Sequence, residues 1–144
     1  MRIGHVHLKI RDIKKSVDFY KTYLDMEVTE NLNNSFVFMS AGDMHHELAL
    51  QEVGKNAVLP GRHHVGLYHV AFEVPNKQAL IETYQKIKQN GIDVYPVDHR
   101  ISWALYFNDP DGNGIEVYWD TRDKQNGVYR WDGKDRLLTD EMLK

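Results

Sequence analysis

The chain has 144 residues, enough for one domain with a sizeable core and too few for two domains of ordinary size. Its 18 Lys and Arg against 21 Asp and Glu give a formal charge of -3, which provides no polybasic surface for nucleic acid or anionic lipid, so a small neutral or anionic partner is expected. Cysteine is absent, which excludes disulfides, thiolate catalysis and thiolate metal sites, whereas eight His can supply neutral metal ligands.

No apolar run has the length needed to cross a membrane. A predicted strand begins within the first residues, and no hydrophobic segment of the kind that a signal peptide requires precedes it. We therefore expect a cytoplasmic protein with no membrane partner.

The first half of the chain predicts the order β-α-β-β-β. Residues 5–11 alternate between apolar and polar side chains, which indicates a half-buried strand. Asp12 can cap a helix that runs to about residue 24. The apolar stripe of this helix consists of Ile13, Val17, Tyr20 and Leu24. Three further strands are expected at 26–29, 36–39 and 47–50.

The same order begins again after a connecting loop without periodicity, at about 53–66. Residues 69–74 match residues 5–10 at an offset of 64, and Val17 and Tyr20 fall on Ile81 and Tyr84 at the same offset. A second helix is expected to end at Gly91. The remaining strands are expected at 92–94, 102–107 and 114–119.

This internal repeat predicts an α+β fold of two tandem βαβββ modules, at about 3–52 and 67–120, within a single domain over residues 1–144. The C-terminal tail, residues 121–144, is polar and charged and suggests no chemistry. It either wraps over the body or over a second subunit, with a short helix near residues 137–143, or is disordered over its final ten residues.

Glu116 is an acid within an apolar predicted strand. A carboxylate between Ile115 and Val117 either faces solvent on an edge strand or needs a partner such as a metal ion. Taken alone, the solvent-facing interpretation is favoured. The repeat reverses this preference, because His5 and His69 begin equivalent strands and lie, like Glu116, opposite their apolar neighbours. Two imidazoles and one carboxylate on a common face are the ligands of a facial triad, which leaves positions open for substrate.

These residues belong to a pattern that resembles the vicinal oxygen chelate superfamily, which includes glyoxalase I, fosfomycin-resistance proteins and type I extradiol dioxygenases. The resemblance covers roughly residues 3–122. The matching motifs are His5-Val6-x-Leu8-x-Ile10-x-Asp12, Ser16-x-x-Phe19-Tyr20, Leu67-Tyr68-His69-Val70-Ala71 and Asp109-Pro110-Asp111-Gly112-Asn113-Gly114-Ile115-Glu116. The superfamily implies a cup-shaped mixed sheet around a metal ion bound by His5, His69 and Glu116.

Three further features resemble the extradiol dioxygenases, and in particular their single-domain, catechol-2,3-dioxygenase-like members. His46-Glu47-Leu48-Ala49 is similar to a His-Asp-x-Ala element whose His acts as acid and base toward oxygen. Tyr106 lies ten residues before Glu116, as the family's active-site Tyr does. The segment that contains His99 resembles the one that carries a further active-site His. The resemblance therefore implies catalytic roles for His46, Tyr106 and His99.

An alternative concerns Glu47. Strict alternation places His46 with Leu48 on the apolar face and Glu47 on the polar face. Glu47 would then be a fourth metal ligand, as the corresponding acid is in glyoxalase I, and the reaction would be an isomerisation or a lyase step. A bulge near residues 44–46 would instead return His46 to the cavity. By resemblance we favour His46.

The favoured hypothesis is an Fe(II)-dependent extradiol dioxygenase that cleaves a catechol-like aromatic diol with O2, as in aromatic compound catabolism. Tyr106 would help the diol to lose its protons, His46 would donate a proton to the oxygen species, and His99 would steady the substrate. Mn, Zn, Ni or Co are possible metals in place of iron. The alternatives are a glyoxalase I-like lyase or isomerase and a metal-free module that binds a small molecule. No nucleic-acid partner is expected, and a homodimer is expected on family grounds.

Overall fold

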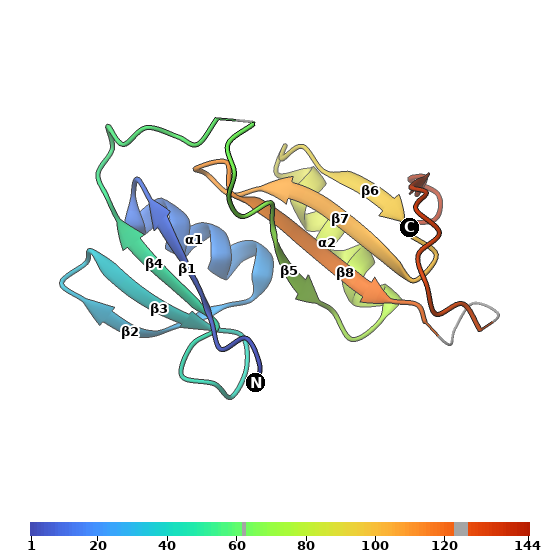
Figure 1. The fold of residues 1–144 in the computed structure, drawn as a ribbon, viewed down its shortest axis with the longest axis horizontal. Coiled ribbons are helices and arrows are strands. Elements are labelled where there is room, and N and C mark those ends of the chain that lie inside the picture. The colour runs from blue at the N-terminus through green and yellow to red at the C-terminus, as the bar shows by residue number, and fades with distance from the viewer. Residues whose placement is uncertain (62, 123–126) are drawn as a thin grey trace. The chain divides into compact units, whose positions relative to one another are not determined.

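The computed structural model describes residues 1–61, 63–122 and 127–144, which form two compact units. The first unit consists of Met1–Gly66 and Asp109–Gly112, and the second of Leu67–Asn108 and Asn113–Lys144. Each unit contains one sheet and one helix (Figure 1). No helix in the three described ranges is long and apolar enough to cross a membrane.

The first unit has the predicted element order. Its elements are β1 (Val6–Ile10), α1 (Ile13–Leu24), β2 (Glu27–Leu32), β3 (Phe36–Ser40) and β4 (Leu48–Glu52). The sheet order is β1-β4-β3-β2, in which β1 and β4 are parallel and the other pairs are antiparallel. Asp12 caps α1 as expected, because its side chain accepts a hydrogen bond from the Lys15 amide at 3.1 Å. The helix packs on β3 and β4 and buries Ser16, Phe19 and Tyr20.

The second unit repeats this topology. Its elements are β5 (Val70–Glu73), α2 (Lys77–Gln89), β6 (Tyr95–Asp98), β7 (Ser102–Asn108), β8 (Gly114–Asp120) and β9 (Arg136–Leu137). The sheet order is β5-β8-β7-β6-β9, so the first and last strands of the module again lie side by side and parallel. The helix α2 packs on β8 (Figure 1). The α+β class and the repeated βαβββ module are therefore confirmed.

One predicted strand is displaced along the chain. The strand expected at 92–94 is β6, which begins at Tyr95. Gly91 adopts a left-handed φ of 71°, and the Ile92 amide donates to the Ile87 carbonyl at 3.3 Å. Residue 92 therefore still belongs to the hydrogen-bonded C-terminal end of α2. Strand pairing begins only after this residue.

The described part of the C-terminal tail packs on the second unit. β9 pairs with β6 in antiparallel fashion, and Leu138 and Leu143 are buried. Asp140 accepts hydrogen bonds from Tyr84 and from Lys88, whose Nζ lies 2.6 Å from Oδ2 of Asp140. The final residues thus pack on the second unit, which favours the alternative in which the tail wraps over the body. In place of the helix expected near 137–143, the structure has β9 and a turn.

The single domain over residues 1–144 stays a prediction. Residue 62 of the predicted connecting loop and residues 123–126 of the C-terminal tail lie outside the described residues.

Candidate functional site

Glu116 lies in the middle of β8, which has β5 on one side and β7 on the other. Its side chain is only 12% exposed, so the solvent-facing edge interpretation does not apply. Tyr106 of β7 is its direct cross-strand partner, and directly opposed side chains share one face of a sheet. The Tyr106 hydroxyl accordingly donates a hydrogen bond to Oε1 of Glu116 at 2.9 Å.

His69 lies directly before β5, with Nε2 2.9 Å from Oε2 of Glu116. Its Nδ1 is buried and has no hydrogen-bond partner among the described residues, so Nε2 is the ring nitrogen that can take a ligand. Two ligand atoms about 2.1 Å from one ion and at right angles to each other are about 3.0 Å apart. The spacing of His69 and Glu116 therefore fits two neighbouring ligands of one metal ion.

Gly114 explains how His69 reaches this position. A Cβ atom at Gly114 would collide with the Tyr68 carbonyl oxygen and lie 3.1 Å from Cβ of His69. Glycine at the start of β8 thus permits the close approach of the segment that enters β5. This approach places His69 beside Glu116.

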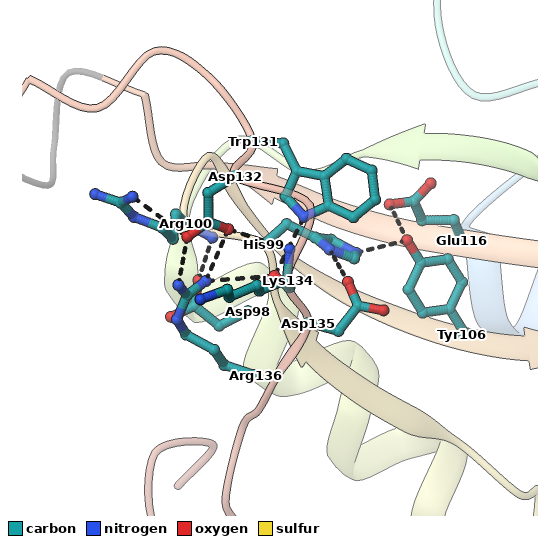
Figure 2. A network of polar contacts seen from close by, with 10 residues as sticks. All are labelled: Asp98, His99, Arg100, Tyr106, Glu116, Trp131, Asp132, Lys134, Asp135 and Arg136. Atoms are coloured by element: carbon teal, nitrogen blue, oxygen red, sulfur yellow. Dashed lines mark hydrogen bonds and ion pairs between the residues drawn. The ribbon is translucent and has the colours of Figure 1, made fainter.

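His99 extends the hydrogen-bonded network beyond Tyr106, as Figure 2 shows. Nε2 of His99 lies 2.8 Å from the Tyr106 hydroxyl, and Nδ1 lies 2.8 Å from Oδ1 of Asp135. Burial raises the pKa of Tyr106 well above its usual range, and the charge and the hydrogen bond of Glu116 raise it further. Tyr106 therefore keeps its proton at neutral pH.

In the first unit, His46 lies against His5. Their ring centroids are 4.6 Å apart, and the His46 ring also stacks on Phe38 at 4.3 Å. His46 precedes β4, which begins at Leu48, so the alternation of that strand does not fix its direction. Desolvation lowers the pKa of His46, and the neighbouring His5 and His45 lower it further.

The Glu47 carboxylate contacts a different part of the first unit from the His46 ring. Its Oε2 accepts a hydrogen bond from the Ala41 amide at 3.1 Å, so the carboxylate is engaged by the loop that follows β3. The ring contact of His5 described above is with His46. Whether His46 or Glu47 takes part in the chemistry stays a prediction.

The structure brings the predicted site residues together in two groups. His69, Glu116, Tyr106 and His99 are connected in the second unit, and His5 and His46 are in contact in the first. No group of three or more His, Cys, Asp or Glu side chains that could hold a metal ion occurs among the described residues. The centre with three ligands therefore stays a prediction.

Sequence reasoning missed Asp135 and Trp131. The Trp131 ring meets the His99 ring edge to face at 5.8 Å, and Asp135 binds the same His99 (Figure 2). Both come from the C-terminal tail, where Asp132-Gly133-Lys134-Asp135-Arg136 is a run of mixed charges. Such a run usually indicates a solvated segment, and no local signal connects it with His99.

The chain belongs to the Glyoxalase/Bleomycin resistance protein/Dioxygenase superfamily, whose family model matches residues 2–117. This confirms the resemblance found in the sequence motifs. The repeated βαβββ module of the structure is consistent with the fold of this family.

Among curated relatives, the chain is 36% identical to the catechol-2,3-dioxygenase of Bacillus subtilis (strain 168), over 82% of this chain and 41% of that protein. It is 32% identical to biphenyl-2,3-diol 1,2-dioxygenase 3 of Rhodococcus globerulus, over 83% of this chain and 63% of that protein. The chain thus spans less than two thirds of the length of these two dioxygenases. It is 29% identical to the lactoylglutathione lyase of Escherichia coli O157:H7, over 81% of this chain and 91% of that protein.

Solved structures agree on the fold. A structure described as a possible glyoxalase from Bacillus cereus has a TM-score of 0.64 and 26% identity, and the match covers 81% of this chain and 97% of that one. A glyoxalase/dioxygenase from Nostoc punctiforme has a TM-score of 0.68 at 22% identity, with 83% and 90% covered. The second likeness bears on the fold alone.

Proposed function

We propose that the chain is an Fe(II)-dependent extradiol dioxygenase that opens the ring of a catechol-like aromatic diol with O2. The observation that carries the proposal is the Tyr106 hydroxyl held between Glu116 and His99, in a chain 36% identical to a catechol-2,3-dioxygenase. A cytoplasmic homodimer is part of the same proposal.

His69 and Glu116 are the proposed metal ligands of the second unit, and His5 is the proposed third ligand. The residues fit such an ion, because Nε2 of His69 and Oε2 of Glu116 are 2.9 Å apart and Nδ1 of His69 is enclosed. When bound, the ion supplies a Lewis acid for the two diol oxygens and a site for O2. Iron is proposed from the dioxygenase relatives, and Mn, Zn, Ni or Co could bind the same donor set.

Tyr106 and His99 are proposed to handle the protons of the diol. The Tyr106 oxygen can accept a hydrogen bond from a substrate hydroxyl while its own proton points to one of two acceptors, Glu116 or His99. His46 is proposed as the acid and base on the oxygen side, because its lowered pKa keeps the imidazole neutral at pH 7.

A second candidate is a lyase of the glyoxalase I kind. It is favoured by the 29% identity to a lactoylglutathione lyase of which the chain covers 91%. This function would use Glu47 as a fourth ligand. Oε2 of Glu47 accepts a hydrogen bond from the Ala41 amide, so the ion would share this carboxylate with that amide.

The two candidates are separated by parallel assays on protein purified without oxygen. Metal content is measured by mass spectrometry, and the protein is then supplied with Fe(II), a panel of catechols and O2, or assayed for formation of lactoylglutathione. We expect stoichiometric metal and a coloured ring-opened product from at least one diol. Stoichiometric metal with lactoylglutathione and no ring-opened product would favour the lyase. Failure to bind any metal stoichiometrically would overturn both functions.

A further inference from the structure

The C-terminal tail contributes a carboxylate to the imidazole beside Tyr106. Asp135 places Oδ1 2.8 Å from Nδ1 of His99. The side chain of His99 is only 15% exposed, whereas that of Asp135 is 57% exposed. Asp135 is thus the solvent-exposed end of a chain of contacts that runs through His99 and Tyr106 to Glu116 (Figure 2).

This contact selects one state of the His99 ring. An ionised carboxylate can only accept hydrogen bonds, so the neutral ring bonded to Asp135 carries its proton on Nδ1. Nε2 of His99 then carries a lone pair and faces the Tyr106 hydroxyl at 2.8 Å. Without Asp135, the proton could reside on either nitrogen, and a proton on Nε2 would point at the Tyr106 oxygen.

Contacts of the residues that precede and follow Asp135 in the C-terminal tail hold it in this position. On one side, Asp132 binds Arg136 at 2.6 Å and Arg100 at 3.4 Å. On the other, Arg136 begins β9, which pairs with β6 through Asp98. The ring of Trp131 meets the His99 ring edge to face at 5.8 Å, and its Nε1 donates to the Lys134 carbonyl at 3.2 Å.

We propose that Asp135 is a positioning residue for the proposed ring cleavage, on which this inference rests. It fixes the tautomer and the orientation of His99, and through that ring it presents an acceptor to the Tyr106 hydroxyl. The C-terminal tail is therefore a functional part of the second unit as well as a structural one.

The test compares Asp135→Ala with Asp140→Ala. Asp140 also anchors the C-terminal tail, through Lys88 and Tyr84, and within the described ranges it forms no hydrogen bond or ion pair with His99. The first readout is the pair of ring-nitrogen NMR signals of His99 in the full chain loaded with Zn²⁺, which needs no dioxygenase activity. We expect the wild type and Asp140→Ala to show the proton on Nδ1, and Asp135→Ala to lose this single state.

The second readout is turnover with Fe(II). Partners that orient a site residue typically contribute about 10- to 100-fold, so Asp135→Ala should lower kcat/KM by about that factor, and Asp140→Ala by about twofold at most. Asp135→Asn keeps an acceptor oxygen and should restore most of the loss. Unchanged His99 signals in Asp135→Ala, or an equal effect of Asp140→Ala, would overturn the inference. A wild type that shows the Nδ1 state but opens no catechol ring would instead overturn the proposed function.

Discussion

The Tyr106 hydroxyl donates a hydrogen bond to Oε1 of Glu116 at 2.9 Å, and Nε2 of His99 lies 2.8 Å from the same hydroxyl oxygen. Its raised pKa means that this proton stays on the phenol oxygen at neutral pH unless a reacting group draws it away. In the proposed reaction, the proton of Tyr106 would pass to Glu116 or to His99, depending on which of them the hydroxyl faces.

Tyr106→Phe removes this hydroxyl and leaves the ring. We expect kcat to fall by about 10²- to 10⁴-fold, the usual contribution of a group that handles protons. The metal content, measured by mass spectrometry, should equal that of the wild type, because Tyr106 is not a proposed ligand. A loss of metal in this variant would instead show that Tyr106 acts by supporting Glu116.

Glu116 and His46 have different proposed roles, and their variants should differ accordingly. Glu116→Gln removes the only anionic ligand of the proposed centre and should weaken metal binding. His46→Ala should retain the metal and slow turnover by about 10²-fold or more. Metal titration of the two variants checks this, and metal loss from both would indicate that the segment with His46 and Glu47 coordinates.

Among the elements, β8 depends on a close approach at its first residue. Gly114→Ala would place a methyl group against the Tyr68 carbonyl and beside His69. We expect a loss of about 1–3 kcal/mol in the free energy of unfolding, together with weaker metal binding. Gly4→Ala is the matched control, because a Cβ atom there meets nothing within 4 Å. Denaturant unfolding should leave the control unchanged, and an equally stable Gly114→Ala variant would refute the explanation.

The C-terminal tail is held partly by carboxylates and should respond to acid. The hydrogen bond from Arg136 lowers the pKa of Asp132, and the hydrogen bond from Lys88 lowers that of Asp140. A carboxylate with a lowered pKa in the folded state stabilises that state above its unfolded pKa of about 3.9, and this contribution is lost as the pH falls through the folded pKa. The docking of the C-terminal tail should therefore persist at neutral pH and weaken below about pH 4.

NMR amide signals of Leu137 and Leu138 report this docking during an acid titration. The double variant Asp132→Asn/Asp140→Asn should show weaker docking at neutral pH and a smaller change on acidification. Both ion pairs are exposed to solvent, so added salt should also reduce the difference between the two proteins. An identical acid response in the double variant would contradict the assignment to these carboxylates.

For the molecule as a whole, the repeat at an offset of 64 predicts both modules, because periodic apolar residues report secondary structure directly. It also predicts that His69 and Glu116 share a site; the two side chains lie 2.9 Å apart in the second unit, and the metal site itself stays a prediction. The start of β6 was displaced because a backbone hydrogen bond at Ile92 extends the end of α2. Asp135 could not be predicted, since its contact with His99 arises from tertiary packing of a polar segment.

The proposed function requires O2 as a substrate. The most direct measurement is mass spectrometry of the product formed from a catechol in oxygen gas enriched in the heavy isotope, with Fe(II)-loaded full chain. A dioxygenase places oxygen atoms from O2 into the opened ring, so we expect a product that carries the label. A product formed at full turnover without label, or turnover that proceeds equally without O2, would contradict the proposed function.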